Sequence, residues 1–228
     1  RYSFAYATKN NDAHTTKSVL HCLRVDCTHL GFEVQHIKSD RGELLDTSVQ
    51  TYIADQGWSI EFTAADASAS NAQIENKHFR ICQSARAMLD HACLKQTFWD
   101  AAIAQATRVW NHWFSSHLQA KQKENPKVEL VPALELRRLL RDAGRDLWTY
   151  VNEAKMLKVW GCLCYAYIVK KEKRKGKFAE VSYLGIHMGR TAHTADAYDV
   201  LSLKTGRIRS TRNIFFDEHN LSLRLTAR

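Results

Sequence analysis

The alternation of apolar and polar residues in the first third of the chain predicts mixed strands and helices. Strands are indicated by a two-residue period, and helices by apolar residues that recur every three or four positions. For the first helix, Thr15 or Thr16 is the expected N-cap and Gly31 ends it. The predicted elements are a strand over 1–8, a helix over 16–30, a strand over 34–39, a helix over 48–55 and a strand over 59–62. This order is typical of an α/β fold.

Two longer amphipathic helices are predicted next, over residues 71–93 and from Thr97 onward, where Thr97 and Asp100 resemble a capping box. The first has one apolar stripe, which consists of Ile74, Ile81, Cys82, Ala85, Met88, Leu89 and Ala92. The second has an aromatic and apolar stripe, which consists of Trp99, Ala102, Ile103, Ala106, Trp110 and Trp113. Aromatic residues at helical spacing indicate packing rather than a base-stacking surface.

Beyond residue 154 the pattern changes to short strands, which indicates a second folded part. The expected strands are 161–169, 181–187, 197–203 and 208–216. Residues 204–207 read Lys-Thr-Gly-Arg and suit a hairpin turn between the last two. The polar stretch before them, with Pro126 and Pro132, is interpreted as a helical connector. The expected organisation is an α/β domain over 1–114, a connector over 115–154, a small β-barrel over 155–218 and a tail over 219–228.

The two predicted parts of the chain also differ in net charge. The net charge of +9 is carried by residues 155–228, which hold 15 Lys or Arg against 6 Asp or Glu, and the rest of the chain balances. A basic module beside a neutral one suggests binding to a polyanion. The densest positive charge is a basic run that consists of Lys170, Lys171, Lys173, Arg174, Lys175 and Lys177. Such a run binds phosphates without sequence preference, and a nuclear localisation signal or a solvated hairpin are the alternatives.

Length and composition narrow the class of protein. A chain of 228 residues can bury a sizeable core, and no apolar run is long enough for a transmembrane helix. The six cysteines do not form a secreted disulfide framework at this length. A zinc site at Cys22 and Cys27 with the neighbouring histidines is weaker than a core role, because these cysteines follow a helical apolar pattern. Cys162 and Cys164 share one face of a predicted strand, which favours buried thiols.

Two carboxylates are candidates for metal-dependent chemistry. Asp40 follows the strand over 34–39, Glu75 lies near the start of the helix over 71–93, and 34 residues separate them. A strand-end Asp and a helix-borne Glu can converge on a pair of Mg²⁺ or Mn²⁺ ions, which catalyse phosphodiester chemistry. Helix physics alone fits an ordinary solvated Glu75 equally well, since the helix dipole favours an acid in a first turn.

An ordered set of short motifs resembles the integrase region of copia-type retrotransposons. The motifs are Ser39-Asp40-Arg41-Gly42, Gln56-Gly57-Trp58-Ser59-Ile60-Glu61-Phe62, Asn71-Ala72-Gln73-Ile74-Glu75-Asn76-Lys77, Ser84-Ala85-Arg86-Ala87-Met88-Leu89, Phe98-Trp99, Asn111, Leu157-Lys158-Val159-Trp160-Gly161-Cys162, Tyr183-Leu184-Gly185 and Ser210-Thr211-Arg212-Asn213-Ile214-Phe215-Phe216-Asp217-Glu218. No single block is specific, but they occur in the family's order along nearly the whole chain. Only residues 115–154 are unmatched.

The resemblance implies an RNase H-like integrase core followed by an SH3-like barrel. It implies that Asp40 and Glu75 are catalytic and bind Mg²⁺ or Mn²⁺ for 3′-end processing and strand transfer of element DNA. It also implies a nuclear protein that binds double-stranded DNA and forms a homo-oligomer, with no membrane. Asn71, Lys77 and Arg80 are the nucleic-acid contacts expected in the core, and the basic run supplies those expected in the barrel.

Departures from the family pattern leave the activity open. The family's first Asp and its zinc module are expected before Arg1, so the sequence as given is expected not to nick DNA alone. Ser70 and Ala72 replace the neighbours usual around Asn71, and Asn76 stands where Arg is common. Three functions therefore compete: an integrase core that is metal-dependent in its parent, a catalytically dead nucleic-acid-binding remnant, and an interaction domain based on the tryptophan-rich helix.

Overall fold

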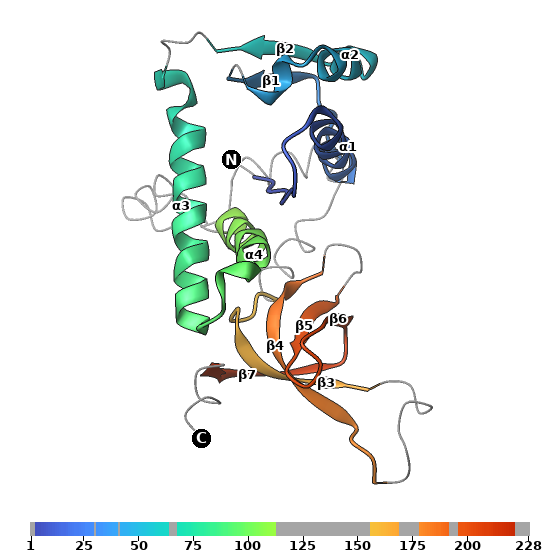
Figure 1. Ribbon diagram of the computed structural model, residues 1–228, viewed down its shortest axis with the longest axis vertical. Coiled ribbons are helices and arrows are strands. Elements are labelled where there is room, and N and C mark those ends of the chain that lie inside the picture. The colour runs from blue at the N-terminus through green and yellow to red at the C-terminus, as the bar shows by residue number, and fades with distance from the viewer. Residues whose placement is uncertain are drawn as a thin grey trace, which may run out of the picture. The chain divides into compact units, whose positions relative to one another are not determined.

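The computed structural model describes residues 3–29, 31–40, 42–63, 68–112, 156–168, 178–191 and 196–221 (Figure 1). The predicted connector over 115–154 and the basic run between Lys170 and Lys177 lie outside these ranges. Contacts divide the chain into two compact units, which are described separately below. The first unit holds residues 1–80 and 111–152, and the second holds residues 81–110 and 153–228.

The first unit contains a small parallel sheet with helices. Its elements are α1 (Ala13–His29), β1 (His36–Ser39), the 3-10 helix η1 (Glu43–Leu45), α2 (Thr47–Asp55) and β2 (Ser59–Phe62). β1 pairs with β2 in parallel, with Ile37 opposite Ile60. A core cluster of Leu20, Val49, Ile53 and Trp58 joins α1 and α2. The sequence analysis predicted β1, α2 and β2 correctly, with bounds that differ from the observed ones by at most two residues.

The predicted opening strand is wrong for the residues that the structure describes. Residues 3–8 have no regular secondary structure. The backbone of Ser3 instead pairs with the side chain of Asn111, whose Oδ1 accepts from the Ser3 N–H at 2.8 Å and whose Nδ2 donates to the Ser3 carbonyl at 2.7 Å. An amide side chain satisfies both backbone groups here, and alternation alone could not reveal that.

The N-cap of α1 also differs from the prediction. Asp12 caps the helix, because its carboxylate accepts a hydrogen bond from the Thr15 N–H at 2.7 Å. The predicted core role of Cys22 is wrong, since its side chain is exposed, and Cys27 is only half-buried. Leu20 is the residue of α1 that is buried.

The two long helices are α3 (Ser68–Ala92) and α4 (Trp99–His112), with the 3-10 helix η2 (Gln96–Phe98) between them. Thr97 lies within η2, so the predicted capping box does not form, and Asp100 bonds the N–H of the next residue. In α3 the predicted stripe is buried only from Ile81 onward, whereas the Ile74 side chain is 63% exposed. The helix was predicted correctly, but only part of its apolar stripe belongs to a core.

The second unit is built on a curled five-stranded antiparallel sheet (Figure 1). Its strands are β3 (Cys162–Tyr167), β4 (Ser182–Arg190), β5 (Tyr198–Ser202), β6 (Ile208–Thr211) and β7 (Ile214–Leu221), in the order β6-β5-β4-β3-β7. The last predicted strand, 208–216, is two strands, because β6 pairs with β5 and β7 crosses to pair with β3. The predicted hairpin turn joins β5 to β6, and Gly206 adopts a positive φ of 65° there.

The sheet has two differently packed faces. The inner face holds Cys164, Ala166 and Val200, with the rings of Tyr183 and Phe216 against them. As predicted, Cys162 and Cys164 are both buried, and this burial raises the pKa of each thiol to about 12.

The outer face of the sheet is covered by helices within the second unit. One core cluster joins α3 and α4 to the strands, and it includes Ile81, Ala85, Leu89, Ala102, Ala106, Leu163, Ile186 and Met188. The second half of α3 therefore shares its core with the barrel. The sequence-based division kept residues 1–114 together, and the contacts group residues 81–110 with the barrel instead.

Residues 156–161, here called the strap, lead into β3 and are bonded to the sheet. The Tyr198 hydroxyl donates to the Met156 carbonyl at 3.0 Å, and the Trp160 indole N–H donates to the Met188 carbonyl at 3.0 Å. His187 Nδ1 lies 3.0 Å from the Val159 carbonyl. Among the described residues, no helix combines the length and apolar character needed to cross a bilayer.

Candidate functional site

Asp40 lies directly after β1, at the carboxyl edge of the parallel sheet. Thr63 follows β2 and ties the two strand ends together, because its backbone N–H and its hydroxyl each donate to the Ser39 carbonyl at 2.8 Å. The Asp40 side chain is exposed, and its closest recorded partner is the Ser39 hydroxyl at 3.3 Å. The local structure thus presents a carboxylate to solvent beside two fixed strand ends.

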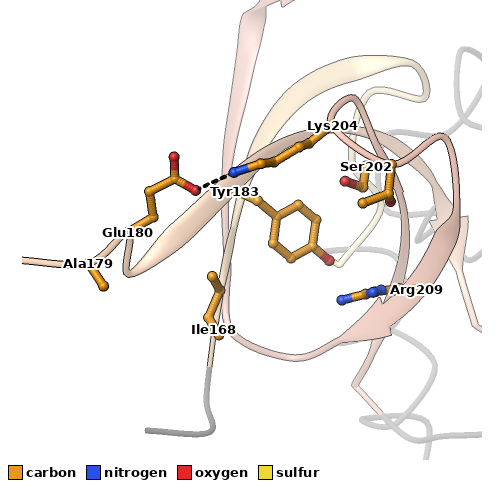
Figure 2. A pocket seen from close by; sticks show the side chains of 8 residues that line it. Ile168, Ala179, Glu180, Tyr183, Ser202, Lys204 and Arg209 are labelled. Atoms are coloured by element: carbon orange, nitrogen blue, oxygen red, sulfur yellow. Dashed lines mark hydrogen bonds and ion pairs between the residues drawn. The ribbon is translucent and has the colours of Figure 1, made fainter. Parts of the chain in front are cut away.

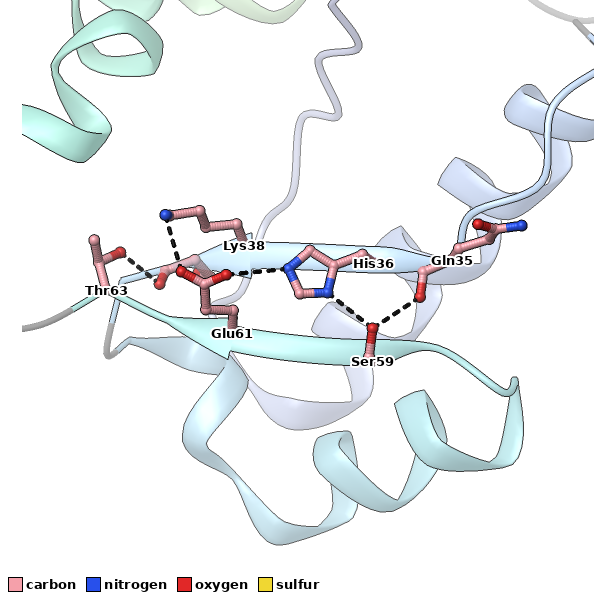
Figure 3. Close-up of polar contacts among 7 residues, drawn as sticks. Gln35, His36, Lys38, Ser59, Glu61 and Thr63 are labelled. Carbon is pink, nitrogen blue, oxygen red and sulfur yellow. Dashed lines mark hydrogen bonds and ion pairs between the residues drawn. The ribbon is translucent and has the colours of Figure 1, made fainter.

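A polar network on the same sheet links β1 to β2 (Figure 3). Glu61 accepts from Lys38 at 2.9 Å and lies 3.4 Å from His36 Nε2, while His36 Nδ1 lies 2.8 Å from the Ser59 hydroxyl. The hydrogen bond from Lys38 and its charge, with a smaller contribution from His36, lower the pKa of Glu61. Because these side chains are exposed, the network adds little stability to the sheet.

Glu75 lies on α3, two turns from its start, and its side chain is exposed. Within the described residues, neither a hydrogen bond nor an ion pair occupies its carboxylate. Asp40 and Glu75 belong to the same unit. Their convergence on shared metal ions stays a prediction.

The other predicted contacts on α3 differ in what the structure records. Arg80 is exposed and its Nε donates to Asn76 Oδ1 at 3.0 Å, so this side chain is held along the helix. Lys77 is half-buried and already interacts with the protein. Asn71 lies in α3, but its side chain is outside the described residues.

The described part of the barrel contains cations that the sequence analysis did not single out. Arg209 on β6 and Lys204 in the β5–β6 turn both line a pocket at one end of the sheet. The alternation of apolar and polar residues predicts that Ile208 faces the core and that its neighbour Arg209 faces solvent. Ile208 is in fact 49% exposed.

A second titratable cluster lies where the strap meets the sheet. Burial lowers the pKa of His187, which packs edge-on against the rings of Tyr198 and Phe216. Burial alone would raise the pKa of Glu218, but hydrogen bonds from Lys158 Nζ at 3.0 Å and from the Val159 N–H at 3.1 Å outweigh it and lower that pKa. These groups hold the strap and leave no carboxylate free for a ligand.

Metal binding by the described residues depends on how their acidic, histidine and cysteine side chains gather. No group of three or more His, Cys, Asp or Glu side chains gathers there as a metal site. Asp40 and Glu75 alone would supply two side-chain ligands to a metal site. Both offer carboxylate oxygens that no ion pair within the described ranges occupies, and such hard oxygens suit Mg²⁺ or Mn²⁺.

The barrel is similar to a known domain family. The retroviral polymerase SH3-like domain family matches residues 162–226, which contain all five strands of the curled sheet. This match confirms the SH3-like part of the predicted fold. The RNase H-like part stays a prediction, since the described residues of the first unit form a sheet of two strands.

Two curated relatives come from Arabidopsis thaliana. The retrovirus-related Pol polyprotein from transposon RE2 is 24% identical over 172 residues, which are 75% of this chain and 10% of the relative. The retrovirus-related Pol polyprotein from transposon RE1 is 28% identical over 151 residues, which are 65% of this chain and 9% of the relative. The chain therefore spans about a tenth of the length of these relatives.

A solved structure also resembles the chain. It is a chain of the simian T-cell lymphotropic virus intasome in complex with the PP2A regulatory subunit B56 gamma, determined by cryoEM. The likeness covers 91% of this chain and 64% of that chain, with 15% identity and a TM-score of 0.42. Taken together, the SH3-like domain match and the two polyprotein relatives support the resemblance that the motifs indicated, which is to the integrase region of retrotransposon Pol polyproteins.

Proposed function

We propose that this chain is the part of a retrotransposon integrase that binds DNA and, within its longer polyprotein, takes part in 3′-end processing and strand transfer. The observation that carries the proposal is the position of the charge. The whole net charge of +9 lies in residues 155–228, and the SH3-like match at residues 162–226 falls inside this range. A basic module of this kind binds phosphates by releasing counterions.

The catalytic part of the proposal rests on two carboxylates. Asp40 is exposed at the carboxyl edge of β1 and β2, and Glu75 is exposed on α3. Neither has an ion-pair partner among the described residues, so both have oxygens available for a cation. A pair of Mg²⁺ or Mn²⁺ ions would stabilise the charge on the attacking and leaving oxygens of a phosphodiester. The two bonds from Thr63 to the Ser39 carbonyl would hold Asp40 in place for that role.

The DNA-binding part is tested with the complete chain. Replacing all six cations of the basic run by glutamine should flatten the dependence of log Kd on log salt by several units for duplex DNA, since each lost phosphate contact contributes roughly 0.9. A matched control replaces six cations elsewhere, namely Lys9, Arg24, Arg86, Lys95, Lys121 and Lys123, and should change the slope much less. Equal flattening in both variants would mean that the basic run is an ordinary solvated hairpin.

The catalytic part is tested in the longer polyprotein by measuring integration of element DNA. Asp40→Asn and Glu75→Gln should each abolish integration and weaken Mn²⁺ binding measured by electron paramagnetic resonance. Glu33→Gln is the control, because Glu33 is an exposed acid that precedes β1 and has no part in the proposed site. If both site variants integrate normally, these acids are not catalytic.

Further expectations follow from the same proposal. The partners are double-stranded DNA at the element ends and at the target, together with further copies of the chain, and the basic run would direct the protein to the nucleus. DNA binding that persists in a polyprotein without integration activity would instead indicate a binding-only remnant. Fluorescence microscopy of the complete polyprotein with and without the basic run checks the nuclear location.

A further inference from the structure

A pocket of about 410 Å³ opens at one end of the five-stranded sheet, and none of the predicted sites includes it (Figure 2). Its wall is formed by Ile168 after β3, Tyr183 on β4, Ser202 at the end of β5 and Arg209 on β6. Its volume is within the range of ligand pockets, about 300–1,000 Å³, and the mouths of small barrels are common places for them.

The pocket continues the inner face of the sheet. Val200 is fully buried on that face and pairs across the strands with Arg209, so both side chains start on the same side of the sheet. Tyr183 packs partly against the inner cluster that includes Val200. The apolar filling of the barrel thus ends at Tyr183, and a cation occupies the next inward-facing position on β6.

Arg209 at this position is available to a ligand. Within the described residues, its guanidinium has neither a hydrogen bond nor an ion pair. Burial raises the pKa of Tyr183, and the positive charge of Arg209 lowers it by a smaller amount. A guanidinium binds phosphate with charge-assisted hydrogen bonds, often two in parallel. An inward-facing Arg that has no acidic partner among the described residues is therefore placed to receive an anion.

Lys204 supplies a second cation at the rim. Its Nζ lies 3.0 Å from a Glu180 carboxylate oxygen, and the two side chains are 70% and 69% exposed (Figure 2). Such an exposed pair contributes little stability, so a phosphate at Arg209 can compete for Lys204. Glu180 also makes the far side of the pocket unfavourable for a ligand that is anionic along its whole length.

The rest of the wall suits a flat, uncharged ring. The Tyr183 ring and Ile168 offer aromatic and aliphatic surface, and Ser202 and Thr205 bring hydroxyl groups to the same pocket. Nucleobases of any sequence stack on aromatic side chains. We propose that the mouth of the barrel binds one unpaired nucleotide, with its base against Tyr183 and its phosphate at Arg209 and Lys204.

Two residues that line the pocket are close in sequence to the basic run. Ile168 and Ala179 flank the segment that contains Lys170 to Lys177, so a nucleic acid attracted by that run would be brought to the pocket. The inference rests to this extent on the proposed DNA binding. It adds a preference for unpaired nucleotides that the charge alone does not give.

The test uses the complete chain and two DNA probes at one salt concentration: a blunt duplex, and the same duplex with a short single-stranded 5′ overhang. The overhang should bind at least about fivefold more tightly, which is the lower end of what one base–aromatic stack contributes. Arg209→Ala should remove this preference. Arg207→Ala removes the same charge two residues away, does not line the pocket and should keep the preference.

The role of the ring is separated from folding by two conservative variants. Tyr183→Phe keeps the ring and should keep the overhang preference. Tyr183→Leu keeps apolar contact with the inner cluster but cannot stack, so it should lose the preference while its thermal unfolding midpoint stays close to that of the parent chain. Loss of the preference in Tyr183→Phe as well would show that the hydroxyl, and not stacking, is responsible.

The outcomes distinguish this inference from the proposed function. If the blunt duplex binds with a steep salt dependence but the overhang gives no advantage, the pocket inference is wrong and the proposed DNA binding stands. If neither duplex binds but thymidine 5′-monophosphate shifts the Tyr183 resonances in an Arg209-dependent way, the pocket stands and the DNA binding is wrong. Arg209-dependent binding of an acidic peptide that displaces the nucleotide at equal concentration would overturn the nucleotide assignment.

Discussion

Gly161, the last residue of the strap, lies directly against α3. Its φ is 80°, and an added Cβ would lie 2.2 Å from the Cβ of Ala92. A side chain here is disfavoured twice, by the left-handed backbone and by the lack of space. The family motif contains this glycine, but the sequence alone gives no reason for it, because Ala92 lies 69 residues earlier.

We expect Gly161→Ala to lower the free energy of unfolding by about 2–4 kcal/mol, as measured by urea denaturation. Gly206→Ala is the matched control, since Gly206 has a similar φ of 65° but open space around it. It should cost about 1 kcal/mol, from the backbone alone. Equal losses in the two variants would show that α3 does not approach the strap this closely.

His187 gives the second unit a pH-dependent stability. Its pKa is lowered, mainly by burial, from the ordinary value of 6.5. Between that value and the lower pKa of the folded state, the unfolded chain binds a proton that the folded chain does not, so stability falls as pH falls. Above about 6.5 this contribution to stability is fully present.

The unfolding free energy should therefore decrease between pH 7 and pH 5, and His187→Phe should reduce this decrease. The phenyl ring keeps the edge-on contacts with Tyr198 and Phe216 and has no proton to bind. His78→Phe changes an exposed histidine and serves as the comparison. If the pH dependence of the His187→Phe variant is unchanged, the buried imidazole does not titrate in this range.

At the scale of the elements, one helix shows what an apolar stripe does and does not predict. Ile74 and Ile81 lie on the predicted stripe of α3, yet their side chains are 63% and 7% exposed. Ile81 is buried because it belongs to the core cluster that α3 shares with the strands of the second unit. The helical period of the sequence predicts which face of α3 is apolar. How much of that face is buried depends on the length of the surface that packs against it.

Alanine substitutions at the two isoleucines measure this difference. Ile81→Ala should lower the unfolding free energy by about 2–4 kcal/mol, because it leaves a cavity among buried side chains. Ile74→Ala should change it by no more than about 0.5 kcal/mol, as at other exposed sites. Both are read from guanidinium denaturation of the complete chain, and similar losses at both positions would mean that the first half of α3 is buried too.

At the scale of the whole molecule, the barrel is not independent of the helices before it. Leu163, Ile186 and Met188 face α3 and α4 across one core cluster. A fragment of residues 155–228 exposes these side chains, and each buried aliphatic side chain of this size contributes about 1.5–3 kcal/mol. The sequence-based boundary at residue 155 is therefore a poor place to cut.

We expect the fragment 155–228 to unfold at a lower temperature than the fragment 78–228, which keeps the second half of α3 and all of α4. Circular dichroism gives the midpoints, and binding of a dye to exposed apolar surface should be stronger for the shorter fragment. Equal midpoints would show that the helices add nothing to the barrel.

The sequence by itself determined most of the elements and the resemblance to a known family. Periods of two and of 3.6 residues identified β1, β2, α2, α3 and most of the barrel, because these periods depend on local geometry. The order of short motifs indicated the Pol family, and the spacing of Cys162 and Cys164 indicated buried thiols. Asp40 and Glu75 came from motif position, and the structure adds that both are exposed and lie in one unit.

Only the tertiary structure decided which surfaces meet. It bonded Ser3 to Asn111 in place of a strand, it grouped residues 81–110 with the barrel, and it turned Arg209 rather than Ile208 toward the inner face. Each of these results depends on residues far apart in the chain. Periodicity identifies a face that can be buried, but the partner that covers it is chosen by packing between distant segments.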